Sequence, residues 1–226
     1  NVADDQGKYD EAKKLYLRAL AIQEKNLGPG HPRVAETLIG LGNVADNQDK
    51  YGEAKKLYLR ALAIFEKTHR PEHPKVASTL MNLGNVAYKQ RKYNEAKKLY
   101  LHALAIQEKN LGPDHSNVAD TLTNLGNVAQ SQGKYAEAKK RYLRSLAIYG
   151  KTQGLGHPKV ALTLYVLGYM LAKQENYQDA YPYAKRALTI WEKKLPPTHP
   201  YLTKHGIPLF IKVTTRLGKK SEAKNT

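Results

Sequence analysis

The chain has 226 residues, 41% of them hydrophobic, and its 37 Lys and Arg against 20 Asp and Glu give a formal net charge of +17. The absence of cysteine excludes disulfides and thiolate metal sites and favours the reducing cytoplasm over secretion. No run of about 18 apolar residues is present, so the sequence predicts a soluble cytoplasmic protein without a membrane-spanning helix.

The first residues already follow a repeating pattern. Residues 1–8 align with residues 43–50, so we expect them to be the end of one helix, and the chain to be a fragment that begins inside an element. A complete second helix at 9–23 follows this end. Together they form a truncated first repeat at 1–25.

A block of sequence at 34–64 then recurs every 42 residues without gaps, and the later copies begin at Val76, Val118 and Val160. A fixed period of this size indicates a stacked array of small helical units. Each copy holds two helical patterns, the first with its apolar residues at i, i+3, i+4 and i+7 and the second with the same spacing. We therefore expect four full helical hairpins, at 31–67, 73–109, 115–151 and 157–194, in a single array over 1–226.

Short signals mark the ends of these helices. Gly133, in the turn of the third full hairpin, suits a left-handed helix end. A histidine precedes each first helix, mostly followed by a proline at the first helical position. The five histidines cannot share metal ions, because neighbouring hairpins are separated by roughly two helix packing distances of 8–10 Å each. We expect them to be structural: His31, His73, His115, His157 and His199.

The pattern decays after Pro200. Gly206 and Pro208 interrupt what should be another first helix, although apolar residues continue to 217. We interpret residues 199–226 as a degenerate C-terminal cap, with a bent helix at 202–216 and frayed last residues.

The repeat resembles a known family. Leu41-Gly42, Ala54, Tyr58 and Ala61 match the motif positions of the tetratricopeptide repeat, and the next two copies match in the same way. The 42-residue period and the G-P-x-H-P loop are similar to the kinesin light chain type, which occurs in motor cargo adaptors and in bacterial relatives. This resemblance implies an all-α, right-handed superhelical solenoid whose first helices line the concave side.

Catalytic motifs are absent. The sequence has no G-x-S-x-G, P-loop, H-E-x-x-H or G-x-G-x-x-G pattern. An enzyme needs one unique constellation of reactive groups, whereas the acids here recur at helix-surface positions. We therefore expect a non-enzymatic scaffold with no catalytic residue, metal or cofactor.

The concave side implied by the resemblance carries an asparagine ladder, made of Asn1, Asn43, Asn85 and Asn127 with Asn82 and Asn124 beside it. Amides can donate to and accept from the backbone of an extended or helical peptide. Side-chain selectivity would come from Ile39, Met81, Tyr88, Tyr165 and Tyr169. The alternative is that the asparagines brace adjacent helices, and one asparagine can do both.

Two ligand classes of related repeats fit this surface poorly. A carboxylate clamp for chaperone tails needs lysine and arginine where Ile39, Asp120 and Asn124 stand. Acidic cargo peptides of the kinesin light chain type could meet Lys89 and Lys173. Acidic side chains at Glu36, Asp46 and Asp120 oppose such a peptide.

The positive charge gathers on the second helices, on the side away from the core. The resemblance makes this side convex, and its residues include Lys13, Lys14, Arg18, Lys55, Lys56, Arg60, Lys97, Lys98, Lys139, Lys140, Arg141, Arg144, Lys185 and Arg186. One interpretation is a solvated face. The alternative is contact with an acidic partner or nucleic acid, of which nucleic acid is less favoured because Tyr16, Tyr58, Tyr100 and Tyr142 are expected to be buried rather than to stack on bases.

Overall fold

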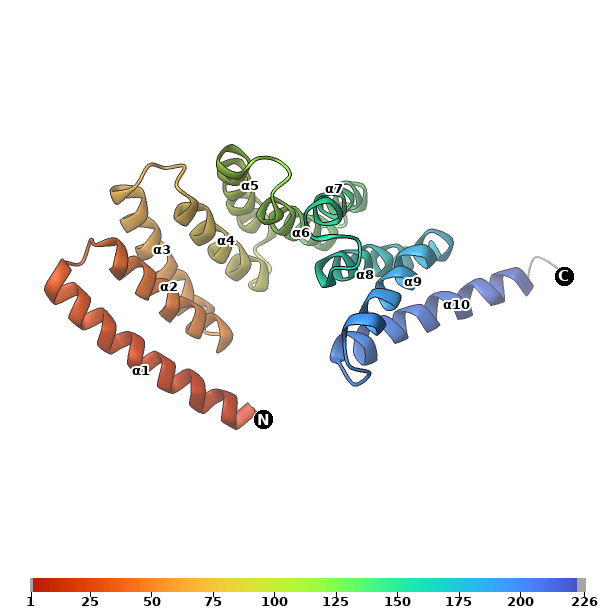
Figure 1. Cartoon of the computed structure of the whole chain (residues 1–226), viewed down its shortest axis with the longest axis horizontal. Coiled ribbons are helices and arrows are strands. Elements are labelled where there is room, and N and C mark those ends of the chain that lie inside the picture. Colours follow the sequence, from red (N-terminus) through yellow and green to blue (C-terminus); the bar gives the residue numbers. More distant parts are fainter. Residues whose placement is uncertain (1, 223–226) are drawn as a thin grey trace. The chain divides into compact units, whose positions relative to one another are not determined.

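The computed structural model describes residues 2–222, and the side chains of residues 7–218. Over this range the chain forms ten α-helices and one π-helical segment, and no strand (Figure 1). The helices are α1 (Val2–Leu27), α2 (Pro32–Asn47), α3 (Tyr51–Thr68), α4 (Pro74–Lys89), α5 (Tyr93–Leu111), α6 (Ser116–Ser131), α7 (Tyr135–Gln153), α8 (Pro158–Lys173), α9 (Tyr177–Lys194) and α10 (Ile207–Glu222), with the π-helical segment at Tyr201–Gly206. None of them combines the length and the apolarity that a bilayer-spanning helix needs. Asn1, the first member of the expected asparagine ladder, lies outside the described residues, as do the last four residues, 223–226.

The chain divides into two compact units, Asn1–Pro113 and Asp114–Thr226. We refer to them as the N-terminal unit, which contains α1 to α5, and the C-terminal unit, which contains α6 to α10. In both units consecutive helices pack as antiparallel pairs: α2 with α3 and α4 with α5 in the first, and α6 with α7 and α8 with α9 in the second.

The turn inside each hairpin contains one residue with a positive φ. Glycine takes this position once, as Gly133, while Asp49, Arg91 and Glu175 adopt the same left-handed conformation in the other copies. The turn is closed by a backbone hydrogen bond, such as Lys50 N to Ala45 O at 2.8 Å. The geometry expected for Gly133 is therefore confirmed, and it is reached by non-glycine residues at the equivalent positions.

The glycine of each Leu-Gly pair is where the two helices of a hairpin touch. A Cβ atom on Gly42 would lie 2.4 Å from Tyr58 Cε1, and one on Gly84 would lie 2.5 Å from Tyr100 Cε1. Any side chain at these positions would overlap the tyrosine ring, because carbon atoms in contact lie about 3.5–4.0 Å apart. The repeated Leu-Gly and Tyr thus specify one close helix-to-helix fit.

The five histidines that precede the first helices act as N-caps. In each case Nδ1 accepts a hydrogen bond from the backbone N–H two residues later, at 3.1 or 3.2 Å. This satisfies one of the free N–H groups at the start of the helix. The structural role expected for these residues is confirmed.

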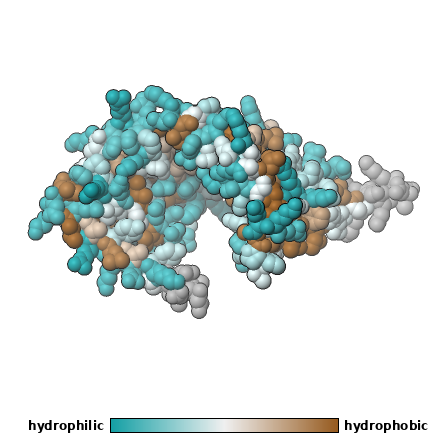
Figure 2. All heavy atoms as spheres, viewed as in Figure 1, coloured by the Kyte–Doolittle hydropathy of each residue, from teal (hydrophilic) through white to brown (hydrophobic). Residues whose placement is uncertain are grey.

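The N-terminal helix differs from expectation in two ways. α1 runs without a break from Val2 to Leu27, so the turn expected near residues 6–8 is absent. In the other copies this turn joins the second helix to the first helix of its own hairpin. In the part of the chain that the structure describes, the helix packed on α1 is α2, the first helix of the next hairpin. Tyr16, expected to be buried, is for the same reason 38% exposed, with its ring against Gly40. Figure 2 shows hydrophobic side chains along the edge where α1 lies.

At the C-terminal end the first helix of a fifth repeat begins as a π-helix. The Ile207 N–H donates to Leu202 O, five residues earlier. Pro208, which lacks an N–H, would break a regular α-helix, and the wider π turn accommodates it before α10 continues. The bent capping helix expected at 202–216 is thus continuous, with its irregularity absorbed in one π-helical turn.

Candidate functional site

The asparagine ladder lies on the first helices. Within each unit we call the surface of the first helices that carries these asparagines the first-helix face, together with the predicted selectivity residues Ile39, Met81, Tyr88, Lys89, Tyr165 and Tyr169. In the N-terminal unit Asn43 is exposed and Asn85 is half-buried, and in the C-terminal unit Asn127 is half-buried. Each is paired with the buried tyrosine of its own hairpin, fifteen positions later in the sequence. The hydroxyls of Tyr58, Tyr100 and Tyr142 donate to the Oδ1 atoms of Asn43, Asn85 and Asn127, each at 2.7 Å.

This hydrogen bond sets the orientation of the amide. A length of 2.7 Å is typical of an O–H···O bond. Burial, and then the charge of Asp46, raise the pKa of the Tyr58 hydroxyl, so it stays protonated and donates at neutral pH. With Oδ1 turned to the tyrosine, the amide N–H₂ group of the same asparagine lies on the opposite edge. The asparagine oxygen therefore braces the hairpin, as one alternative of the sequence analysis held.

The other predicted residues of the N-terminal unit lie on α2 and α4. Ile39 and Met81 are half-buried and pack against the core, and Asn82 is half-buried beside them. The Tyr88 ring lies 5.7 Å from that of Tyr93, between ring centroids. Lys89 Nζ lies 2.8 Å from Asp46 Oδ2 of the preceding repeat.

The predicted tyrosines of the C-terminal unit belong to a larger aromatic cluster. The rings of Tyr165 and Tyr169 stack with 5.9 Å between centroids, and Lys173 Nζ lies 5.2 Å from the centre of the Tyr169 ring. Tyr165 also contacts the buried Trp191 at 5.6 Å and His205 at 5.4 Å, between ring centroids. Trp191 and His205 were not predicted from the sequence, because they come from the second helix and from the decayed repeat. Asn124, also a predicted residue of this unit, is half-buried on α6, whereas the cluster residues lie on α8, α9 and the π-helical segment.

The acids that seemed to oppose an acidic peptide are all engaged by lysines. Glu36 pairs with Lys75, Asp46 with Lys89, and Asp120 with Lys159, whose Nζ lies 2.8 Å from both carboxylate oxygens. Each pair joins one first helix to the next within a unit. The first-helix face is therefore less acidic than the sequence alone suggests, and the signal that could have revealed this is the recurring separation of about one repeat length between partners.

Ion pairs between repeats also occur on the second helices. Lys13 pairs with Glu53 and Lys55 with Glu95, at 2.8 and 2.6 Å (N to O). The second lysine of each Lys-Lys pair is exposed and has no ion-pair partner among the described residues, as at Lys14, Lys56 and Lys98. Lys13, Lys55 and Arg60 of the expected basic stripe thus link repeats, whereas Lys14, Lys56 and Lys98 face solvent.

One loop contains a small cavity of about 380 Å³ between α3 and α4, lined by His69, Arg70, Glu72, His73, Pro74, Lys109 and Asn110. The two imidazole rings lie 4.1 Å apart. His73 Nδ1 already caps α4, and Glu72 pairs with Lys109. Within residues 7–218 no group of three or more His, Asp or Glu side chains could hold a metal ion.

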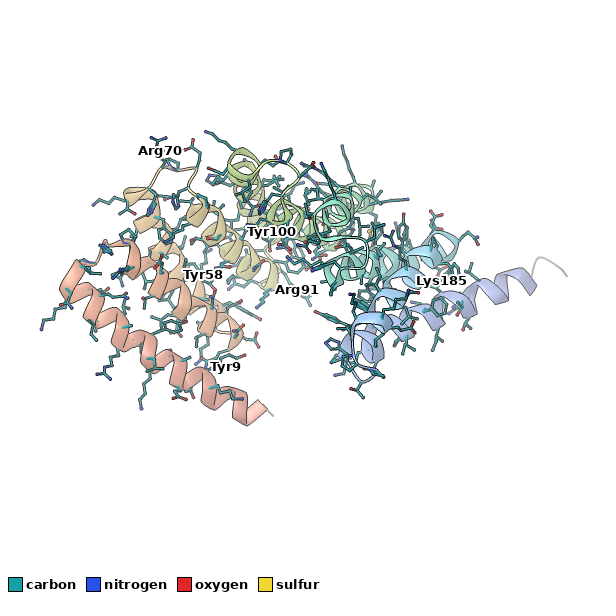
Figure 3. The ribbon with its side chains drawn as sticks, viewed as in Figure 1. Tyr9, Tyr58, Arg70, Arg91, Tyr100 and Lys185 are labelled. Atoms are coloured by element: carbon teal, nitrogen blue, oxygen red, sulfur yellow. The ribbon has the colours of Figure 1, made fainter. Side chains whose placement is uncertain are left out.

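These hairpins, their Leu-Gly to Tyr contacts and their 42-residue period place the chain among known repeat proteins. Figure 3 labels two of the defining tyrosines, Tyr58 and Tyr100. The family model described as tetratricopeptide repeat matches residues 2–67, 47–90, 75–151 and 120–193. No curated protein sequence matches the chain significantly.

Solved structures agree with this match. Kinesin light chain nearly identical TPR-like repeats of Podosopora anserina are 25% identical with a TM-score of 0.70, over 85% of this chain and 92% of that one. BtubC from P. vanneervenii is 18% identical with a TM-score of 0.75, over 96% and 85% of the two chains. The apo form of RapI is 20% identical with a TM-score of 0.71, over 95% and 60%. The chain therefore belongs to the tetratricopeptide repeat family, a family of protein–protein interaction scaffolds, and its all-α tandem hairpins are similar to kinesin light chain-like repeats.

Proposed function

We propose that this scaffold is non-enzymatic and that the first-helix face of each unit holds an extended or helical peptide segment of a partner protein. Asn43, Asn82 and Asn85 in the N-terminal unit, and Asn124 and Asn127 in the C-terminal unit, contact the peptide backbone. Selectivity comes from the side chains beside them, namely Ile39, Met81, Tyr88, Lys89, Tyr165 and Tyr169.

The observation that carries the proposal is the Tyr–Asn hydrogen bond. A solvent-facing amide normally rotates, and ordering it on binding costs side-chain entropy. Here the buried tyrosine holds the oxygen, so the N–H₂ edge is oriented before a peptide arrives. Such an oriented donor suits the backbone C=O groups of a peptide, which are acceptors whatever the peptide sequence is.

The same hydrogen bond determines how the proposal should be tested. Asn85→Ala removes the donor and also leaves the buried Tyr100 hydroxyl without its acceptor, so binding and stability would change together. Asn85→Asp keeps an acceptor oxygen of the same shape for Tyr100, removes the amide donor and adds a negative charge. Asn94→Asp, on an exposed surface of α5, is a matched charge control.

The probes are peptides selected from a random displayed library on the unmodified chain and then resynthesised. We expect Asn85→Asp to weaken them about tenfold, in line with loss of a hydrogen bond worth about 0.5–1.5 kcal/mol plus repulsion of the peptide carbonyl. Asn94→Asp should leave affinity unchanged. If the peptides bind the Asn85→Asp and Asn43→Asp variants as tightly as they bind the unmodified chain, the ladder only braces the hairpins.

An acidic partner on the second helices is the second candidate. It is supported by Lys14, Lys56 and Lys98, which are exposed and have no ion-pair partner among residues 7–218. It predicts binding that weakens steeply with salt. Reversing Lys56 and Lys98 should abolish it, whereas reversing Lys55 would mainly break the ion pair with Glu95. Binding that is insensitive to salt would contradict this candidate.

A further inference from the structure

The outer side of α10 carries an exposed apolar stripe. The inner side of this helix packs on α9 through the buried Leu209 and Val213. On the outer side Ile211 is 57% exposed and Ile207 is 39% exposed. With the half-buried Phe210 and Thr214 they follow the spacing i, i+3, i+4 and i+7, and we call these four residues the α10 outer stripe.

This spacing is the one that first helices use to receive a second helix. In α2 the stripe of Leu38, Leu41, Gly42 and Ala45 is covered by α3. The α10 outer stripe has the same pattern. At its edge the Phe210 ring lies 5.8 Å from that of Tyr181 in α9, between ring centroids, whereas Ile207 and Ile211 are exposed and form the open part of the stripe. A helix is therefore the shape of partner that this surface fits.

The stripe does not fit a helix of the chain's own repeat. In the hairpins the tyrosine ring of the second helix sits against a glycine, with no room for a Cβ atom. The π turn before α10 adds one residue to the helix, so Ile211 stands where Gly42 stands in α2. The Ile211 side chain fills the space that such a tyrosine would need. The partner helix must instead present small or aliphatic residues to Ile207 and Ile211.

The charges around the stripe define the rest of the partner. Residues 193–221 contain seven Lys or Arg and no Asp or Glu. Lys204, Lys212 and Arg216 are exposed and have no ion-pair partner in the described part of the chain. This contrasts with the first repeats, where lysines such as Lys55 and Lys89 pair with acids of a neighbouring repeat.

From this juxtaposition we infer that α10 is a docking site for an amphipathic helix of a partner protein, with a small or aliphatic seam flanked by Asp and Glu. Nucleic acid would satisfy the three cations and leave the exposed isoleucines without apolar partners. A membrane surface would require a wide apolar face, and the larger apolar face of α10 is already packed on α9. The site is separate from the first-helix face, so it stands or falls independently of the peptide proposal.

The test uses a synthetic helical peptide of the length of α9, with leucine and alanine at i, i+3, i+4 and i+7 and glutamate on both flanks. Its binding to the whole chain is measured by fluorescence anisotropy at low and at physiological salt. Ile211→Asp should weaken binding about tenfold or more, as expected for a central apolar contact. Lys212→Glu with Arg216→Glu should weaken it about fivefold and reduce the salt dependence.

Matched variants keep the result interpretable. Leu155→Asp alters a similarly exposed apolar residue in a loop, and Lys67→Glu alters an exposed cation near the end of α3, outside both candidate surfaces of the proposed function. Neither should change affinity. Circular dichroism and thermal unfolding of Ile211→Asp should match the unmodified chain, because the side chain is mostly exposed, and Ile207→Asp gives an independent second variant.

Four results would overturn the inference. The first is no binding of the acidic helix, and the second is equal binding of a version whose seam is serine. The third is preferential capture of duplex DNA, or of vesicles with about three parts phosphatidylcholine to one part phosphatidylserine, that Ile211→Asp abolishes. The fourth is a concentration-dependent dimer in sedimentation that Ile211→Asp dissociates, since a second copy would then occupy the stripe.

Discussion

Replacing Gly84 with alanine tests the glycine–tyrosine contact that recurs in the first three full hairpins. The added Cβ would lie 2.5 Å from Cε1 and 2.7 Å from Cδ1 of Tyr100. Carbon atoms in contact prefer separations of about 3.5–4.0 Å, so the overlap is about 1 Å. The ring cannot swing aside freely, because Tyr100 is 2% exposed and its hydroxyl is bonded to Asn85.

One stabilising and two destabilising effects set the size of the change. Alanine is a better helix former than glycine by about 1 kcal/mol. Overpacking of a tight core costs about 1–3 kcal/mol, and loss of the Tyr100–Asn85 bond adds about 1 kcal/mol. We therefore expect Gly84→Ala to lower the free energy of unfolding by about 2 kcal/mol.

Urea unfolding followed by circular dichroism measures this change, and two other glycines provide controls. A Cβ atom on Gly52 would meet nothing within 4 Å, so Gly52→Ala should stabilise the chain by up to about 1 kcal/mol. A Cβ on Gly168 would lie 3.2 Å from Ala184 N, so Gly168→Ala should fall between the other two. An increase in the urea midpoint for Gly84→Ala, similar to that of Gly52→Ala, would refute the close fit of glycine and tyrosine.

Three further changes test other parts of the structure. Arg91→Gly should raise the free energy of unfolding by up to about 1 kcal/mol, because Arg91 has a φ of 59° and glycine adopts this conformation without strain; a loss in urea unfolding would contradict this. Burial, then His69 and Lys75, lower the pKa of His73, so the unfolded chain binds the proton more readily. The contribution of His73 to the free energy of unfolding should be complete above about pH 6.5 and decrease as the pH drops below it. His73→Ser keeps an N-cap acceptor, and its melting temperature should fall less between about pH 7 and pH 5 than that of the unmodified chain. Tyr100→Phe should free the Asn85 amide, seen as a change in its side-chain ¹⁵N–¹H₂ resonances by NMR, and unchanged resonances would show that the bond with Tyr100 does not orient it.

The hairpins could be predicted from the sequence because their signals are local and repeated. Apolar spacing, the Leu-Gly pair and the histidine before each first helix all lie within one repeat, and the structure places them in α2 to α9 as their pattern indicates. The exposed Tyr16 shows the limit of this reasoning. Its position in the repeat predicts burial, but burial depends on a neighbouring helix that the pattern of a single helix does not reveal.

Properties of the candidate site were harder to predict because they depend on relations between helices. The sequence identified Asn85 and Lys89 as surface residues, but the orientation of the Asn85 amide depends on Tyr100, and the charge of Lys89 is offset by Asp46. Tyr100 and Asp46 are distant in the sequence from the residues they contact. These contacts depend on how two packed helices are rotated relative to each other. Pattern analysis gives the side of a helix on which a residue lies, and it gives no partner for that residue.

The last full hairpin explains why the asparagine and tyrosine belong together. One repeat after Asn127 and Tyr142 stand Tyr169 and Ala184, so both members of the pair change at once. Without the tyrosine of the second helix there is no buried hydroxyl for an asparagine oxygen to accept. The first-helix position carries the aromatic ring of Tyr169 instead. This ring stacks on Tyr165, and Lys173 Nζ lies over its face. The Tyr–Asn pairs therefore maintain the hairpins and orient the amides that we propose to contact a peptide backbone. On the same proposal the choice of partner resides where the copies differ, at Ile39, Met81, Tyr165 and Tyr169.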